Sequence, residues 1–366
     1  MNKTMMRVVG VILVIATFLL ISECAKKEKP ILGSGDAASA VYVAPGDYDE
    51  FYAFTSGGFS GQLGVYGLPS GRLFKEIPVF SLDPENGYGF NEETKDMLKT
   101  SFGHIPWDDS HHPELSQTEG VTDGRWIFIN GNNTPRIARI DLKNFETAEI
   151  IEIPNSGGNH GSPFTTQNTE YVVASTRFSV PIPQADVPID TYKENFNGTL
   201  SFIKVNPDDG HMNIEFQILV PGFDYDLASG GKGPSHGWAF FTSYNTEQAN
   251  TLLEVNASKN DKDFIAAVNW KLAEKYLAEG KGKTRPGEHY VNRMNHKTHS
   301  AESTLNKTVT VLDPADCPGL IYYLPTPKSP HGVDVDPTGE YIVGGGKLAA
   351  VLSVHSFSKM IKAIED

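Results

Sequence analysis

Short runs of apolar or alternating residues recur along most of the chain, and turns rich in glycine, proline, asparagine and aspartate separate them. An aromatic or β-branched run bounded by such turns is typical of a β-strand. Most groups of runs open in the same way, with a turn, one polar residue and an aromatic residue. The strands are predicted, group by group, at 51–54, 63–68 and 73–80; 125–129, 136–142 and 148–154; 170–174, 198–205 and 214–220; 237–241 and 264–268; and 341–343, the last after a turn at 336–339.

Repeated groups of three or four strands indicate an all-β fold, and a β-propeller is the architecture that stacks such groups as blades. The openings are irregularly spaced along the chain. From the pattern alone, one large β-sandwich or a pair of sandwiches therefore remains the alternative. Residues 49–366 are predicted to form the folded domain.

One region departs from this pattern. Residues 271–279 are predicted to be helical, because their apolar residues fall on one side of a helix. Residues 279–305 are polar, and we interpret them as an excursion between strands on one rim of the fold. The spacing of His296 and His299 can chelate a metal, and His289 lies upstream in the same stretch. In so polar and basic a stretch, a solvated loop is the preferred interpretation.

The N-terminus has the pattern of a targeting segment. Lys3 and Arg7 precede the apolar run 8–21, which has the length of a signal-peptide core and is short for a bilayer span. No Arg-Arg pair precedes the run, which favours general secretion. Cys24 follows directly and resembles the lipidated cysteine of a bacterial lipoprotein, although Glu23 departs from the small residue expected there.

We therefore predict a signal peptide at 1–24 and a polar linker at 25–48. Cys24 is lipidated in one interpretation, and in the others the signal is cleaved without lipidation or stays as an anchor. All of them place the protein outside the cytoplasm, in the periplasm, and lipidation would attach it to a membrane.

Charge and cysteine content restrict the kind of site. The net charge is −14 and the pI is near 5.2, which argues against nucleic acid as a partner because phosphate binding needs a basic surface. The chain has 366 residues and two cysteines, Cys24 and Cys317. Two cysteines make neither a disulfide framework nor a four-cysteine metal site. Any metal would depend on histidine, carboxylate or backbone ligands.

Three histidine-containing turns point to such a site. They are His111-His112-Pro113, Asn159-His160-Gly161 and Pro330-His331-Gly332. Neutral imidazoles are common ligands for copper, zinc and iron. Adjacent side chains on a strand point to opposite faces, so two neighbouring histidines can serve one cluster only from a turn or a strand end. Asp109 is close enough in sequence to orient one of the rings.

These motifs carry a family resemblance over roughly residues 49–354. In their order and sequence they resemble the N-terminal part of the nitrous-oxide reductases, of the branch without a twin-arginine signal. The matching stretches are Asp109 to Pro113, TDGRWIFINGNNTPRIARIDL from Thr122, Asn159-His160-Gly161, WAFFTSYNTE from Trp238, and PTPKSPHGVDVDPTGEYIVGGGKL from Pro325.

The resemblance implies a seven-bladed propeller, of which this chain would hold about the first four to five blades. It also implies a tetranuclear copper-sulfide centre bound by seven histidines. Four of those positions match residues of this chain: His111, His112, His160 and His331. The family carries structural calcium as well, and its matched ligand positions here are Tyr244, Glu247, Asp263 and Ser329.

The implied reaction is reduction of N2O to N2 and water. The implied partners are an electron donor such as a c-type cytochrome or cupredoxin, and a second copy of the chain in a homodimer. Three further cluster histidines, the later blades and a C-terminal cupredoxin domain with a dinuclear copper centre would lie beyond Asp366. The chain is therefore expected to be a fragment that is inactive by itself.

Two other functions are compatible with the pattern. A non-catalytic extracytoplasmic propeller would bind a protein or ligand on one rim, without metal. A propeller hydrolase or lactonase would need an axial set of Asp, Glu and Asn ligands, and the histidine-containing turns argue against it. Hydrolysis by a Ser-His-Asp triad is disfavoured because no Gly-x-Ser-x-Gly elbow occurs in the sequence.

Overall fold

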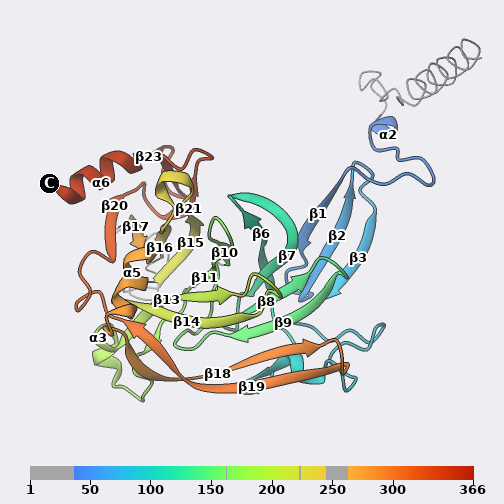
Figure 1. Ribbon diagram of the computed structural model, residues 1–366, viewed down its shortest axis with the longest axis horizontal. Helices are drawn as coiled ribbons and strands as arrows, with labels where there is room; N and C mark the ends of the chain where they lie inside the picture. Colours follow the sequence, from blue (N-terminus) through green and yellow to red (C-terminus); the bar gives the residue numbers. More distant parts are fainter. Residues whose placement is uncertain (1–36, 162, 222–223, 245–262) are drawn as a thin grey trace, which may run out of the picture. The chain divides into compact units, whose positions relative to one another are not determined.

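The structure is a computed structural model that describes residues 37–161, 163–221, 224–244 and 263–366 (Figure 1). The predicted signal peptide and Cys24 lie outside these residues. The chain divides into two compact units, the first made of residues up to Ala53 together with Tyr66–Leu73, and the second of Phe54–Val65 and Phe74–Asp366. No helix in the described part of the chain is long and apolar enough to cross a membrane.

The first unit is small and is organised around one carboxylate. It contains the short helix α2 (Ala37–Ala40). Asp49 accepts hydrogen bonds from the backbone N–H of Ser70 at 2.8 Å and from its hydroxyl at 2.9 Å, and it pairs with Arg72 at 3.2 Å. These bonds close the turn that contains the cis peptide between Leu68 and Pro69.

The strands form antiparallel groups that follow the chain. β1 (Phe51–Ser56), β2 (Gln62–Leu68) and β3 (Leu73–Pro78) make a three-stranded sheet, and β15, β16, β17 and β20 make a four-stranded one. A last sheet contains β21, β22 and β23. The bounds are β15 Asp224–Gly230, β16 Trp238–Tyr244, β17 Phe264–Asn269, β20 Ile321–Pro325, β21 Pro330–Val335, β22 Tyr341–Gly346 and β23 Leu352–Ser356.

Two further groups are joined into one eleven-stranded sheet. One group runs β6, β7, β8, β9, and the other runs β10, β11, β13, β14, with β12 at the side of β13. The hairpin of β18 and β19 lies between them, because β18 pairs antiparallel with β9 and β19 pairs parallel with β14 (Figure 1). The bounds are β6 Ser110–Thr118, β7 Val121–Gly131, β8 Arg136–Asp141, β9 Glu146–Glu152, β10 Phe164–Thr165, β11 Tyr171–Ser175, β12 Val180–Pro181, β13 Phe196–Val205, β14 Met212–Pro221, β18 Lys283–Asn295 and β19 Ser300–Leu312.

Helices are few and short. α5 (Trp270–Ala278) begins after Asn269, whose side chain accepts a hydrogen bond from the Leu272 N–H, and it buries Trp270 and Ala273. α6 (Phe357–Glu365) starts after Ser356 in the same way. The remaining elements are β4 Lys99–Thr100, β5 Gly103–His104, α3 Tyr192–Asn195 and the 3-10 turns η1 Lys95–Leu98, η2 Ile189–Thr191 and η3 Gly233–Ser235.

Apolar side chains fill the space between successive groups within the second unit. One core joins the ends of β2 and β3 to β7, β8 and β9, through residues such as Leu63, Ile77 and Ile129. Another packs β13 and β14 against β16, β17 and α5 around Trp270. A third core lies around Phe128 and Ile151 and includes residues of β11 and β13. The side chains of β7, β8 and β9 alternate between the first and the third core, which explains their nearly continuous buried runs.

The all-β prediction is confirmed, and five consecutive antiparallel groups of three or four strands are the blade units of a propeller. The helix predicted at 271–279 is also confirmed. The interpretation of residues 279–305 as a solvated loop was wrong, because most of them form the long hairpin of β18 and β19. The turn predicted at Asp336–Gly339 is confirmed, and β22 begins after it at Tyr341.

The hairpin is held by a buried carboxylate that the sequence pattern did not indicate. Glu149 of β9 is fully buried and accepts a hydrogen bond from Arg293 Nε of β18 at 2.5 Å. It also accepts the Met212 N–H of β14 at 3.0 Å and lies 3.4 Å from Arg139 Nε. One carboxylate therefore links both blades to the hairpin, which explains how a polar segment joins a sheet.

Candidate metal centre

Three histidines that are far apart in the chain meet at one place. Ring nitrogens of His111, His112 and His160 all lie within 4.8 Å of one another. The Nε2 atoms of His111 and His160 are 3.1 Å apart. The ring centroid of His331 lies 6.3 Å from that of His160. The structure thus brings the four histidine positions matched from the sequence to one site.

The paired histidines come from a strand end, as the sequence analysis required. β6 begins at Ser110, and its pairing with β7 shifts register between Ser110 and Pro113. Such a bulge breaks the strict alternation of side chains, so both rings can turn toward one cluster. The centroids of the His111 and His112 rings are 4.5 Å apart and the rings are nearly perpendicular. Pro113 is tolerated there because a bulge does not need its missing N–H.

A buried asparagine fixes the two histidine turns relative to each other. Asn130 of β7 accepts the His112 N–H at 2.7 Å through Oδ1. Its Nδ2 donates to the carbonyl oxygens of Asn159 at 2.5 Å and His160 at 2.9 Å. The Asn130 side chain therefore holds the backbone of His112 and the turn at His160 in fixed positions relative to each other.

The outer ring nitrogens of His111 and His160 each have a carboxylate neighbour. Asp109 Oδ2 lies 3.5 Å from His111 Nδ1, and Asn132 Nδ2 holds that oxygen at 3.0 Å. Asp226 Oδ1 lies 2.5 Å from His160 Nδ1. A carboxylate on one nitrogen leaves the other free to act as a ligand and makes it more basic. Asp109 was noted from its position in the sequence, whereas Asp226 has no motif that could have indicated it.

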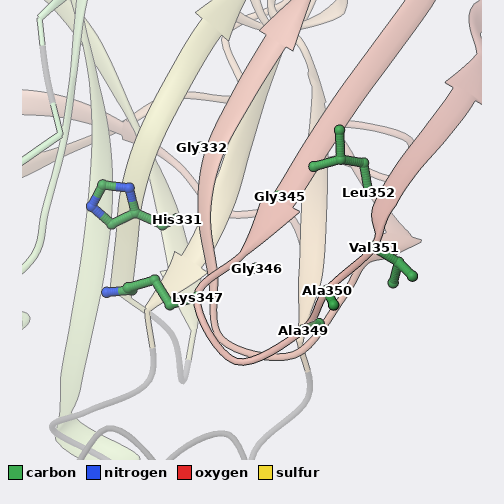
Figure 2. A pocket seen from close by; sticks show the side chains of 9 residues that line it. All are labelled: His331, Gly332, Gly345, Gly346, Lys347, Ala349, Ala350, Val351 and Leu352. Atoms are coloured by element: carbon green, nitrogen blue, oxygen red, sulfur yellow. The ribbon is translucent and has the colours of Figure 1, made fainter.

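His331 lies near the second carboxylate oxygen of Asp226. Its Nε2 is 3.7 Å from Asp226 Oδ2, and its ring is about two-fifths exposed. Figure 2 shows the His331 ring and the Lys347 side chain pointing the same way from the β21–β22 end of the fold. They line a cavity of about 420 Å³ together with the turn that follows β22.

The electrostatics of the site favour a neutral imidazole at His112. Burial, together with the charges that His111 and His160 would carry, lowers the pKa of His112 to about 4. His112 Nε2 is buried and has no hydrogen-bond partner in the described part of the chain. A buried, neutral and unpaired ring nitrogen beside two others is the donor set that copper accepts. The residues present therefore fit a copper ion held by imidazoles.

The other histidines lie elsewhere. His296 and His299 are exposed at the tip of the β18–β19 hairpin, and His289 is buried in β18. His211 lies 3.7 Å from Glu149, and His355 Nε2 lies 2.9 Å from the Pro325 carbonyl oxygen. Cys317 is fully buried in the core around Trp270, away from the histidines.

The calcium positions remain a prediction. Glu247 lies outside the described residues, and Tyr244 is described only as the last residue of β16. Thr242 pairs with Ile265, so Tyr244 and the half-buried Asp263 leave the sheet at the same end. Ser329 is buried with φ near 55°, and its carbonyl oxygen accepts the Lys347 N–H at 2.7 Å.

Comparison with known proteins adds a sequence relationship. Over 333 residues the chain is 31% identical to the nitrous-oxide reductase of Pseudomonas fluorescens, covering 90% of this chain and 48% of that protein. It is 28% identical over 327 residues to the nitrous-oxide reductase of Stutzerimonas stutzeri, covering 89% and 47%. No protein-family model matches the chain.

Among solved structures, the chain superposes on the β-propeller domain of Cps50 (Swd1) from Myceliophteria thermophila with a TM-score of 0.37 and 8% identity, over 83% of this chain and 80% of that one. It superposes on the Dos1 propeller with a TM-score of 0.36 and 9% identity, over 82% and 68%. Likenesses of this size do not bear on the site, and the fold assignment depends on the sheets described above. In sequence, the chain is similar to nitrous-oxide reductases over about nine tenths of its own length, and it spans about half the length of the curated relatives that it matches.

Proposed function

We propose that this chain provides the copper-binding histidines of a periplasmic nitrous-oxide reductase. The observation that carries the proposal is the convergence of ring nitrogens from His111, His112 and His160 within 4.8 Å, with His331 beside them. The relatives' names supply the substrate, N2O, and the class of reaction. Copper is the metal we propose, because an all-imidazole donor set without a carboxylate ligand suits it well.

The protein's own residues would hold and orient the ligands. Asn130 fixes the backbone of His112 and His160, and Asp109 and Asp226 fix the outer nitrogens of His111 and His160. Burial keeps His112 neutral, so its lone pair stays available near pH 7. The site would therefore be organised before any metal arrives, which lowers the cost of binding.

Bound copper would supply a site for N2O and the two electrons that its reduction to N2 and water consumes together with two protons. N2O is linear and nearly apolar, so it is a poor ligand for a single Lewis-acid ion. The proposal therefore includes the copper-sulfide cluster, calcium at the Tyr244, Glu247, Asp263 and Ser329 positions, and electrons from a c-type cytochrome or a cupredoxin. It also includes export through the N-terminal signal and a homodimeric assembly.

The proposal is tested by copper content. The chain, exported and produced with copper available, is assayed for bound metal and for visible absorption from sulfide-to-copper charge transfer. We expect bound copper in the parent chain and a large loss in His160→Ala, whose ring is central to the cluster. His296→Ala, at the exposed hairpin tip, is the matched control and should keep its copper.

A non-catalytic extracytoplasmic propeller is the second function, and the same measurement separates the two. It predicts a parent chain that binds no more copper than His160→Ala does. Reduction of N2O by the loaded protein, measured with an artificial electron donor, would support the enzymatic proposal directly.

A further inference from the structure

Asp226 lies between two of the four histidines. It is fully buried. Its Oδ1 is 2.5 Å from His160 Nδ1, and its Oδ2 is 3.7 Å from His331 Nε2. Oδ2 is buried and, among the residues that the structure describes, makes no hydrogen bond. Burying an ionised carboxylate with one oxygen unpaired costs free energy, and a hydrogen-bond donor at the second oxygen would remove this cost.

The backbone around Asp226 is shaped to place this carboxylate. The pairing of β15 with β16 shifts register between Tyr225 and Ala228. Tyr225 lies in the hydrophobic core, and because adjacent strand residues point to opposite faces, Asp226 is directed away from that core and reaches His160. The approach is also close, because a Cβ at Gly161 would overlap the Asp226 carbonyl oxygen.

The His331 strand is held against the same place. Thr242 of β16 is buried, and its hydroxyl accepts the Leu227 N–H at 3.1 Å. The same hydroxyl lies 2.9 Å from the His331 carbonyl oxygen, to which it donates. One side chain thus fixes the residue after Asp226 and the backbone of His331. The His331 ring itself is about two-fifths exposed.

A positive charge supports the carboxylate from the solvent side. Lys347 lines the His331 cavity, and its charge stabilises the ionised form of Asp226. Pro330 pairs with Gly346, so the β21–β22 ladder keeps His331 and Lys347 together (Figure 2). The groups that face Asp226 are therefore two imidazoles and one ammonium, all of which favour a carboxylate.

We propose that Asp226 is a positioning residue that sets the tautomers of two histidines at once. Oδ1 fixes His160 with its proton on Nδ1, so that Nε2 is its ligand nitrogen. Oδ2 is the acceptor for His331, which fixes the proton on Nε2 and makes Nδ1 its ligand nitrogen. The proposal deepens the copper function given above and rests on it for the ligand role, whereas the tautomers themselves do not depend on metal.

The first test reads the tautomers directly. Protein labelled with ¹⁵N at histidine is studied by long-range ¹H–¹⁵N correlation without metal, at a pH where the imidazoles are neutral. We expect the Nδ1–H tautomer for His160 and the Nε2–H tautomer for His331, with each signal assigned by a single substitution. In Asp226→Asn both should become mixtures. A parent protein with His160 as the Nε2–H tautomer would overturn the proposal, whether or not the variant folds.

The second test measures Cu(I) affinity by competition with a chromogenic chelator. Asp226→Asn should bind Cu(I) about 10- to 100-fold more weakly than the parent, the usual effect of losing a carboxylate behind a ligand histidine. Asp334→Asn is the matched control: it makes the same change on β21, three residues after His331, where the side chain is exposed. It should leave affinity and tautomers unchanged.

The outcomes separate this inference from the proposed function. Unchanged tautomers and unchanged affinity in Asp226→Asn would reject the positioning role while leaving the copper site intact. Altered tautomers in a protein that binds no Cu(I) would uphold the positioning role and reject the copper function. A loss of affinity without any tautomer change would also reject the inference, since it would assign Asp226 a purely electrostatic effect.

Discussion

At the scale of single residues, the two histidine-glycine pairs of the site differ in what the glycine does. They belong to the histidine-containing turns Asn159-His160-Gly161 and Pro330-His331-Gly332. The structure distinguishes them, because a Cβ at Gly161 would overlap the Asp226 backbone, whereas a Cβ at Gly332 meets no atom within 4 Å. Gly161 is therefore required by close packing, and Gly332 is not.

This difference gives a prediction. Gly161→Ala should lower the free energy of unfolding by about 1–3 kcal/mol, the usual cost of inserting a methyl group into a packed site. It should also weaken Cu(I) binding, because β15 must move away from the His160 turn. Gly332→Ala should do neither. Urea unfolding and Cu(I) competition of both variants check this, and an equal loss in the two would show that the close approach at Gly161 is unimportant.

At the scale of elements, the hairpin of β18 and β19 is the least expected feature. Its polar composition suggested a loop, but a hairpin can be polar where its neighbours supply buried partners. Glu149 does so for Arg293, and Glu152 accepts the Tyr290 N–H at 3.1 Å. His289 precedes Tyr290 in β18, and its side chain is 4% exposed. Its Nδ1 atom lies 3.1 Å from the Gly287 carbonyl oxygen.

The burial of His289 predicts a pH dependence. Burial lowers its pKa below the usual 6.5, so the folded state resists protonation that the unfolded chain accepts. Above the unfolded pKa both states are neutral and the folded state keeps its full stability. As the pH falls through about 6.5, the unfolded state binds more protons and stability decreases.

His289→Gln should remove this contribution. From about pH 7.5 to about pH 5.5, the parent is expected to lose about 1 kcal/mol more than His289→Gln in urea unfolding. His296→Gln, at the exposed tip of the same hairpin, is the control and should follow the parent. Parallel pH profiles for the parent and His289→Gln would contradict the prediction.

At the scale of the whole molecule, the site depends on sheets that are distant in sequence. The paired histidines come from β6, His160 follows β9, and His331 belongs to β21. All of them lie in the second compact unit. A metal that binds them together can bind only the folded protein, so its binding free energy adds to the stability of the fold.

Copper should therefore raise the melting temperature. With free Cu(I) at about 100 times the dissociation constant, the gain is about 2.7 kcal/mol, which corresponds to roughly 5 °C or more in a chain of this size. Scanning calorimetry with and without a Cu(I) chelator measures it. His160→Ala should lose the shift and His296→Gln should keep it. A shift that survives in His160→Ala would place the bound copper elsewhere.

Much of this protein follows from its sequence alone. Alternating runs between glycine and proline turns determine where strands form, because a pleated strand needs a side-chain period of two. Histidine in three turns, with only two cysteines in the chain, determines the kind of donor that a metal site would have. The order of these motifs is sufficient to show the resemblance to the nitrous-oxide reductases.

Only the tertiary structure decided how the site is supported. Asp226 and Asn130 reach the histidines through hydrogen bonds across strands, and no local pattern encodes a partner that lies dozens of residues away. The hairpin of β18 and β19 is a second case, since its strands are stabilised by carboxylates of β9. Local sequence determines which conformation a segment prefers, whereas packing determines which polar groups meet.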